Sequence, residues 1–392
     1  MAGNASMENE RRILVVGAAG GVGRRTCKEV CRQFGPGALV VGDCRAAQGQ
    51  ELARALGKDV SWRFVDVNHG ESIKNAVADV DAVIVAAQQK EPLVQAVCAQ
   101  YRIVCLDITF SPDFVHKVER LQEKASSQGA VLVAAAGLFP GLSGIMAKYA
   151  CECFEHVESI DVGMLQNTNG SAGPTGIADM LGLFAQPATF RKNGAQQLYP
   201  GFTVKREFAY PEPFGRHKQR LINFYEASVV AERCHTQAVN YWTGFDKSGF
   251  NGLLAVLNKI GILSLFNSQR LRMGLARTVG VFKGRTEPQS EPIAVTVEVS
   301  GTQGGKPCGA TVSVTGPSDY GTTAMCVVAM AKLILNKCVQ ANGVCFPMDI
   351  FSLHLLLDAI NSKDVALYES PAKVWSGRPL LKGSAVLRLR GQ

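Results

Sequence analysis

The sequence predicts an α/β protein, with a doubly wound parallel sheet first and a second α+β domain containing a mixed or antiparallel sheet after it. Short apolar runs alternate with helical segments over residues 13–109, and a glycine cluster follows the first run. Beyond Gly137, Gly- and Pro-rich loops surround strands of alternating polarity. The first pattern is typical of a parallel sheet covered by helices on both faces, and the last is typical of antiparallel strands.

The first half of the chain is expected to alternate strand and helix. A helix should begin at about Gly21, and others should lie near 51–57 and 72–78. The apolar runs between them predict strands at 13–17, 38–43, 61–67, 81–87, 103–108 and 130–136. Because most of these runs are short and predominantly apolar, we expect strands that are buried on both faces.

The second half predicts strands at 159–165, 293–301 and 309–316, with the last two joined through the turn GTQGGK as a hairpin. A helix is expected over 322–338, and Pro347 should prevent its continuation. We therefore expect three segments: a dinucleotide-binding domain over 1–136, an α+β domain for substrate and dimer contacts over 137–320, and a segment over 321–392 that packs back on the first domain.

Composition excludes several classes of protein. The chain has 392 residues and a formal charge of +8, but its basic residues are scattered, which argues against nucleic-acid binding. Twelve cysteines and a polar N-terminus without an apolar core predict reduced thiols and a cytoplasmic protein. The pairs Cys27/Cys31 and Cys151/Cys153 lack partners at zinc spacing, so no metal is expected.

One segment, residues 252–266, is nearly apolar but is interrupted by Asn258 and Lys259. It is shorter than a membrane-spanning helix, so stable membrane insertion is not expected. We expect a core or interface helix here. A surface that meets a hydrophobic substrate or a membrane is the second interpretation.

The glycine cluster Gly17-x-x-Gly20-x-x-Gly23 differs by one position from the commonest dinucleotide-binding spacing but contains the same three parts. The first glycine permits a tight turn out of a strand, the second lets the backbone approach phosphates, and the third lets the helix pack on the sheet. Phosphate would then lie at the positive end of the helix. The cluster predicts a Rossmann turn that binds a dinucleotide through Gly17, Ala19, Gly20, Gly21, Val22 and Gly23. A turn with no ligand is the alternative.

Asp43 lies twenty residues after Gly23, at the end of the next predicted strand. An acid there hydrogen-bonds a ribose 2′-hydroxyl and favours NAD, whereas a nearby arginine such as Arg45 accommodates the 2′-phosphate of NADP. The sequence leaves NADP or NAD open, with a lean toward NADP. Further contacts to the cofactor are expected where the third and fourth strands end, at Asp66, Val67, Ala86, Ala87 and Gln88.

Several segments together resemble the saccharopine dehydrogenase-like family. They are, in order, the GxxGxxG start, CAQYRIVCLDIT, GLFPGLSG, SAGPTGIADMLG with FRKNG, YPEPFG, VEVSGTQGGK, and DYGTTAMCVVAMAKLIL with GVCFP. The resemblance covers nearly the whole chain. Cys105 departs from it, because the family often has tyrosine there.

The resemblance implies an NAD(P)-dependent oxidoreductase that transfers hydride to or from the C=N bond of an imine or amino-acid-derived substrate, and a homodimer is the default for this architecture. Two alternatives stay open. The substrate could be a hydrophobic, lipid-like molecule with a C=C bond, or the protein could be a sensor or scaffold that binds the dinucleotide without turnover.

Candidate residues for the chemistry follow from the predicted strand ends. Asp107 ends the fifth strand and is the first candidate for a proton donor or orienting group, with a turn cap beside Thr109 as the alternative. A backbone wall beside the substrate is expected from Gly137, Pro140 and Gly141, or else a linker turn. In the second domain, polar loop positions that could contact the substrate include Asn167, Thr175 and Arg216.

Overall fold

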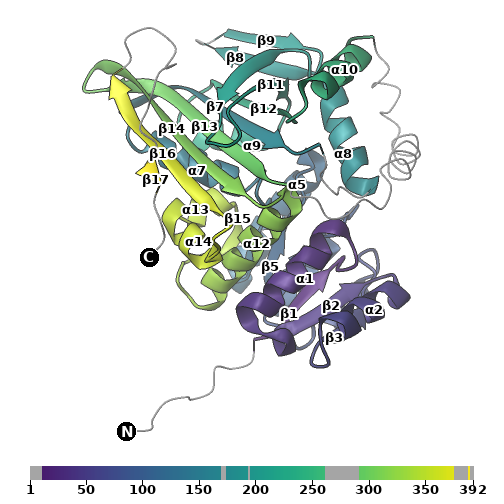
Figure 1. The fold of residues 1–392 in the computed structure, drawn as a ribbon. Coiled ribbons are helices and arrows are strands. Elements are labelled where there is room, and N and C mark those ends of the chain that lie inside the picture. The colour runs from purple at the N-terminus through teal and green to yellow at the C-terminus, as the bar shows by residue number, and fades with distance from the viewer. Residues whose placement is uncertain (1–10, 169–173, 193–194, 261–290, 375–386, 389–392) are drawn as a thin grey trace. The chain divides into compact units, whose positions relative to one another are not determined.

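The chain folds into two compact units, each built from two stretches of sequence (Figure 1). Unit 1 contains Met1–Leu142 and Tyr320–Asn361, and unit 2 contains Ser143–Asp319 and Ser362–Gln392. A computed structural model describes residues 11–168, 174–192, 195–260, 291–374 and 387–388. The C-terminal segment expected over 321–392 is therefore divided between the two units.

Unit 1 is built on a seven-stranded sheet in the order β15-β6-β5-β4-β1-β2-β3. All of its strand pairs are parallel. The strands are β1 (Ile13–Val16), β2 (Leu39–Asp43), β3 (Ser61–Phe64), β4 (Ala82–Val85), β5 (Val104–Asp107), β6 (Val131–Val133) and β15 (Gly343–Cys345). The predicted doubly wound parallel sheet is confirmed, and β15 is an addition that the sequence did not reveal.

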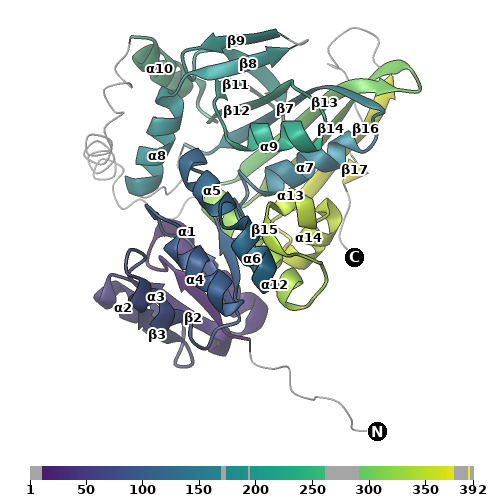
Figure 2. The same ribbon diagram turned by 180° about the vertical axis from the view of Figure 1, so that it is seen from behind.

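Helices cover both faces of this sheet. Figure 1 shows α1 (Gly21–Phe34) and α12 (Asp319–Leu335) on the near face, and Figure 2 shows α4 (Leu93–Tyr101) and α6 (Gln122–Gln128) on the opposite one. The remaining helices are α2 (Ala46–Leu56), α3 (Gly70–Val77), α5 (Pro112–Glu119), α13 (Pro347–Ile350), α14 (Leu353–Ile360) and a short 3₁₀ turn at Pro36–Ala38. Because both faces are covered, the central strands are apolar along their whole length, with Ile13 and Leu14 fully buried.

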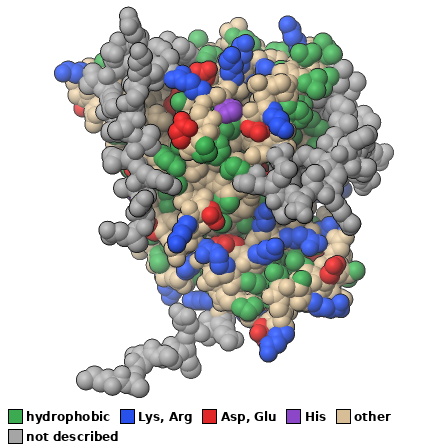
Figure 3. Space-filling model, viewed as in Figure 1, with side chains coloured by type: hydrophobic (Ala, Val, Ile, Leu, Met, Phe, Trp, Pro, Cys, Tyr) green, Lys and Arg blue, Asp and Glu red, His purple; other side chains and the backbone are tan. Residues whose placement is uncertain are grey.

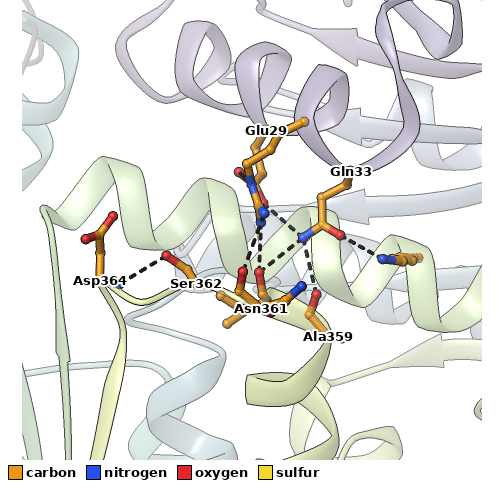
Figure 4. A network of polar contacts seen from close by, with 9 residues as sticks. Glu29, Gln33, Ala359, Asn361, Ser362 and Asp364 are labelled. Carbon is orange, nitrogen blue, oxygen red and sulfur yellow. Dashed lines mark hydrogen bonds and ion pairs between the residues drawn. The ribbon is translucent and has the colours of Figure 1, made fainter. Parts of the chain in front are cut away.

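A polar network binds α1 to the part of the chain that returns after α12 (Figure 4). Arg32 pairs with Glu29 at 2.6 Å and donates to the carbonyl oxygen of Ile360 at 2.8 Å. Gln33 donates to the carbonyl oxygen of Ala359 at 3.2 Å and accepts from Lys332 at 2.9 Å. These contacts explain why residues far apart in sequence form one compact unit.

Unit 2 is built on an eight-stranded mixed sheet in the order β10-β11-β12-β7-β13-β14-β16-β17. Its strands are β7 (His156–Gln166), β10 (Lys205–Ala209), β11 (Arg216–Ile222), β12 (Val239–Phe245), β13 (Ile293–Gln303), β14 (Lys306–Gly316), β16 (Ala366–Val374) and β17 (Leu387–Arg388), and a separate hairpin joins β8 (Ala188–Lys192) to β9 (Ala195–Tyr199). Only β12 and β7 pair in parallel. The predicted second domain with a mixed sheet and the β13–β14 hairpin are confirmed.

The helices of unit 2 are α7 (Leu142–Cys151), α8 (Pro174–Ala185), α9 (Glu226–Arg233) and α10 (Ser248–Lys259). Figure 2 shows α7 and α9 on one face of the mixed sheet. A buried carboxylate joins these elements, because Glu226 accepts from the hydroxyl of Ser143 and, at 2.8 Å, from that of Tyr241. Burial, together with the charge of Glu226, raises the pKa of Tyr241, so its hydroxyl stays protonated.

Two further expectations concern thiols and membranes. All twelve cysteines carry free thiols. None of the described helices has both the length and the hydropathy needed to cross a bilayer. The apolar segment expected over 252–266 begins within α10, and its residues 261–266 lie outside the described part of the chain.

Candidate functional site

Most of the predicted site residues of unit 1 lie along one edge of the seven-stranded sheet. In a parallel sheet, all strands end at the same edge, which is where ligands bind in folds of this kind. The ends of neighbouring strands are linked by hydrogen bonds from Ala86 N to the carbonyl oxygen of Val16 and from Ala136 N to that of Asp107, both 2.8 Å long. The edge is therefore continuous from the glycine turn to the loop after β6.

The glycine turn after β1 is shaped by close backbone contacts. Gly17 has a φ of +78°, and a Cβ atom added to it would lie 2.7 Å from the carbonyl oxygen of Ala86. A Cβ atom on Gly23 would lie 2.2 Å from the carbonyl oxygen of Gly17. One on Gly20 would meet only that same oxygen, at 3.1 Å. The first and third glycines are thus required by packing, whereas the second has one close neighbour, the carbonyl oxygen of Gly17, and no other atom within 4 Å.

Helix α1 begins at this turn with an uncompensated positive end. Its N-cap residue is Gly20, no side chain caps it, and its first turn contains no acidic residue. The first N–H groups of an α-helix have no partner within the helix, and the helix dipole adds a partial positive charge there. An anionic group such as a phosphate fits this position.

Tyr320, at the start of α12, closes one side of the turn. Its ring lies 2.7 Å from the place where a Cβ atom on Gly21 would be, and the guanidinium of Arg25 lies 5.6 Å from the ring centroid. Gly21 is therefore also required by packing. Sequence analysis missed Tyr320 as a neighbour of the glycine turn, although its segment, DYGTT, contributed to the family resemblance.

Asp43 ends β2 and is paired with Arg45. The carboxylate accepts from Ala19 N at 2.8 Å, from Arg45 N at 2.9 Å and from Arg45 Nε at 3.0 Å. Burial alone would raise the pKa of Asp43, but the hydrogen bonds and charge of Arg45 and the Ala19 N–H group outweigh it, so the pKa is lowered. The Arg45 side chain is 49% exposed, which leaves it accessible to a further anion.

Asp107 ends β5 and is held by neutral donors. It accepts from Gln95 Nε2 at 2.5 Å, from Gln89 Nε2 at 3.1 Å and from Thr109 N at 2.6 Å. Burial raises its pKa to about 6, against the opposing effect of these hydrogen bonds. Asp107 can therefore bind or release a proton near neutral pH.

The two glutamines that hold Asp107 were not anticipated. Gln89 follows β4, and Gln95 lies on the buried side of α4. The oxygen Oε1 of Gln95 is buried and has no hydrogen-bond partner within the structure. It can accept from a donor that a ligand or a water molecule brings to this position. The sequence holds no spacing that would have singled out either residue.

The loop after β6 forms a tight turn. Gly137 N donates to the carbonyl oxygen of Pro140 at 3.0 Å, and Gly141 has a φ of +121°. A Cβ atom on Gly137 would lie 3.3 Å from Cγ2 of Thr323 on α12. The three residues expected as a backbone wall therefore form one compact turn beside Asp107, whose carbonyl oxygen binds Ala136 N.

The remaining predicted residues of unit 1 are divided between the loop after β3, the apolar core and the glycine turn. β3 ends at Phe64, before Asp66, and the Asp66 carboxylate accepts from Asn68 N at 2.9 Å. Val67 packs against the apolar core of unit 1. Ala87 lies against the glycine turn, because its Cβ would be 2.9 Å from a Cβ on Gly17. Gln88 and Val22 belong to unit 1, at the end of β4 and the start of α1.

The substrate residues expected after Gly141 all belong to unit 2. Asn167 follows β7. Thr175 lies in the first turn of α8, and its side chain is outside the described part of the structure. Arg216 begins β11 and pairs with Glu207 at 2.9 Å on an exposed part of the sheet. Within unit 2 these residues come from separate elements.

No protein-family model matches the chain, and no curated protein matches it by sequence. Among solved structures, apo saccharopine dehydrogenase (L-Glu forming) from Saccharomyces cerevisiae superimposes with a TM-score of 0.64 at 14% identity, covering 89% of this chain and 96% of that one. The C. glutamicum DAP dehydrogenase in complex with DAP matches with a TM-score of 0.44 at 13% identity, over 91% and 99% of the two chains. At the lower score, the shared geometry is too limited for a comparison of sites.

The match with the yeast enzyme extends over nearly the whole of both chains, which fits the resemblance found in the sequence motifs. At 14% identity it bears on the fold and not on individual residues. The chain has the fold of saccharopine dehydrogenase.

Proposed function

We propose that this protein is an NAD(P)-dependent oxidoreductase that transfers hydride to or from a C=N bond in an amino-acid-derived substrate. The observation that carries the proposal is the glycine turn at the sheet edge, where Gly17 and Gly23 pack tightly and Gly20, with a single close neighbour, precedes an uncapped helix. A tight glycine turn that leads into an uncapped helix can accept a diphosphate at close range.

Different residues along the edge would bind different parts of such a cofactor. The start of α1 would hold the diphosphate, and Arg45 and Asp43 would hold the adenosine ribose. The Asp43 carboxylate already accepts from four N–H donors, three of them on Arg45, whereas the Arg45 guanidinium is half exposed. This arrangement favours a 2′-phosphate over a 2′-hydroxyl, and hence NADP over NAD.

The nicotinamide ring supplies or accepts the hydride when the cofactor is bound, and the protein supplies orientation and the proton. Asp107 is our candidate for the group that exchanges this proton, because its raised pKa lies close to neutral pH. The loop from Gly137 to Gly141 would limit the access of water at the same end of the edge.

Only the fold supports the proposal that the substrate is derived from an amino acid. The Saccharomyces cerevisiae protein with this fold is a saccharopine dehydrogenase that forms L-Glu. Within the described part of unit 2, Arg206 pairs with Glu298 at 2.6 Å and with Asp161, and Arg216 pairs with Glu207. These pairs neutralise two cations that a substrate carboxylate could otherwise bind.

Titration calorimetry with NADPH and NADH tests the proposal. The wild type should bind NADPH with micromolar affinity and NADH more weakly. Gly20→Asp adds a carboxylate at the start of α1 and should abolish binding, while Gly20→Asn makes the same 3.1 Å contact with the Gly17 carbonyl oxygen and adds the same volume without the charge, so it should retain part of the binding. Absence of binding to either cofactor by the folded wild type would exclude the proposed function.

A further inference from the structure

Helix α10 in unit 2 exposes large apolar side chains, and its buried face holds two asparagines beside Leu254 and Ala255. A helix on the surface of a soluble protein normally buries its apolar side chains and turns its polar ones to water. In α10, the buried positions include Asn251 and Asn258. The exposed positions carry large apolar side chains instead.

The two asparagines fix the orientation of the helix. Asn251 accepts from Phe245 N and donates to the carbonyl oxygen of Phe245, both at 2.8 Å. Asn258 donates to the carbonyl oxygen of Phe184 at 2.9 Å and also to that of Gly201. Because rotation of α10 would leave these buried amides without partners, the apolar face is held outward.

The outward face is concentrated and continuous. Its members are Phe250 at 37% exposure, Leu253 at 55%, Val256 at 57% and Ile260, which follows the helix, at 63%. They are spaced three or four residues apart, so they lie on one side of the helix. Only Phe64, Tyr101 and Leu198 are comparably exposed elsewhere in the described structure, and they are scattered. We call the four residues the α10 face; Figure 3 shows hydrophobic side chains gathered over this helix.

The charged side chains at the two ends of α10 are both basic. Lys247 and Lys259 are exposed there, and the helix contains no acidic residue. Asp246, which precedes Lys247, accepts hydrogen bonds from Thr168, including one of 2.7 Å from its backbone N–H.

We propose that the α10 face is a docking surface for an anionic phospholipid membrane. An exposed apolar row bordered by cations is the combination that holds a helix in the plane of a bilayer interface. The apolar side chains enter the boundary between head groups and acyl chains, and the cations bind lipid phosphates. In a symmetric dimer through this face, Lys247 and Lys259 of one copy would lie near the same lysines of the other. Their repulsion disfavours such a dimer.

The surface would add a function to the proposed chemistry, because it would bring unit 2 to a lipid surface through the described helix α10. Docking by four side chains is reversible and adjustable by salt, since the electrostatic part weakens as ions screen the lipid charge. The surface lies wholly within unit 2 and does not depend on a nucleotide bound to unit 1.

Vesicle co-sedimentation of the full-length protein tests the inference. Vesicles of phosphatidylcholine with phosphatidylglycerol should pellet the wild type, and vesicles of phosphatidylcholine alone should pellet much less. The double variant Leu253→Ser/Val256→Ser removes apolar contact from exposed positions and should weaken partitioning about tenfold or more. The matched control, Phe64→Ser, changes an equally exposed apolar residue of unit 1 and should bind like the wild type.

Three outcomes would overturn the inference. The wild type could fail to bind anionic vesicles, the double variant could bind as well as the wild type, or Phe64→Ser could weaken binding equally. Light scattering on the same samples detects a second copy as the occupant: a wild-type dimer that Leu253→Ser/Val256→Ser dissociates, without vesicle binding, would assign the face to self-association. Calorimetry with NADPH is unaffected by any of these results, so the proposed function is tested separately.

Discussion

The two carboxylates at the edge of the seven-stranded sheet, Asp43 on β2 and Asp107 on β5, have the same exposed fraction, 2% each. Each accepts several hydrogen bonds, yet the pKa of Asp43 is lowered and that of Asp107 is raised to about 6. Two differences act together. Asp107 lies deeper in the protein, so burial raises its pKa more, and its partners are neutral donors, whereas Asp43 has the guanidinium of Arg45. Burial raises the pKa of a carboxyl unless a nearby cation compensates for lost hydration.

The edge of the sheet therefore has a charged side at Asp43 and Arg45 and a titratable side at Asp107. On the side of β2, a permanently ionised pair is suited to binding. On the side of β5, a carboxyl that changes protonation near neutral pH is suited to proton exchange. Four substitutions test the contrast, beginning with the glycine turn that lies between the two sides.

Gly23→Ala should have the largest effect on the fold. Its new methyl group would lie 2.2 Å from the carbonyl oxygen of Gly17, so β1 and α1 must separate. We expect a loss of about 3 kcal/mol in the free energy of unfolding, measured by urea titration. Gly37→Ala is the control, because its Cβ would meet nothing within 4 Å. Equal stability of both variants would show that the turn is not tightly packed.

Asp107→Asn should remove the titratable carboxyl at the end of β5. The variant keeps the side-chain volume but cannot exchange a proton, and we expect turnover to fall about a hundredfold. In the wild type, the rate of the reductive direction should decrease as the pH rises through about 6, because the proton donor is lost. The variant should show no such step in its pH profile. An unchanged profile would assign the proton to another group.

The raised pKa of Asp107 also affects stability, and the sign is opposite to the usual carboxylate case. The folded state binds this proton more tightly than the unfolded state, for which the ordinary value is 3.8. The stabilising contribution is therefore complete below that value and is lost as the pH rises to about 6. For Asp43, whose pKa is lowered, the contribution is present above its ordinary value and is lost as the pH falls.

Arg45→Ala should make the two sides alike, because Asp43 would then be buried without a cation. The pKa of Asp43 should rise, as measured by carboxyl-resolved NMR titration. Affinity for NADPH should fall about tenfold, while affinity for NADH should change little. Arg54→Ala, which removes an exposed arginine from α2, is the matched control. An equal loss of affinity for both cofactors would contradict a specific role for Arg45 at the 2′-position.

Arg216→Ala should have the smallest effect. Its guanidinium pairs with Glu207 on an exposed part of the sheet of unit 2, and such pairs contribute about 0.5 kcal/mol or less to stability. Thermal unfolding should therefore hardly change. A large rise in KM with unchanged stability would assign Arg216 to substrate binding, as the sequence suggested.

The sequence predicted the strands and the glycine turn of unit 1 because both depend on local patterns. A run such as Ile13–Val16 is apolar since both faces of its strand are buried, and the spacing of Gly17 and Gly23 reflects contacts within a few residues. Tyr320 escaped notice because it meets Gly21 across roughly three hundred residues of sequence, and no local pattern records such a contact.

The ion pair between Asp43 and Arg45 could likewise not be predicted from the sequence. Asp43 and Arg45 are neighbours whose side chains could have pointed apart, so the choice between a ribose ligand and an ion pair needed the geometry. The apolar composition of α10 is visible in the sequence and suggests that the helix could have an exposed apolar face. Which side faces outward depends on the bonds of Asn251 and Asn258, made to residues that the sequence pattern does not identify.

Amide hydrogen exchange in the presence and absence of saturating NADPH is the decisive measurement for the glycine turn, because it reports which backbone N–H groups a nucleotide covers. We expect slower exchange at Ala19 to Gly23 and at Arg45, with no change at the peptide containing Phe64. Protection confined to other segments, or none at the glycine turn while NADPH is bound, would contradict the proposed nucleotide site.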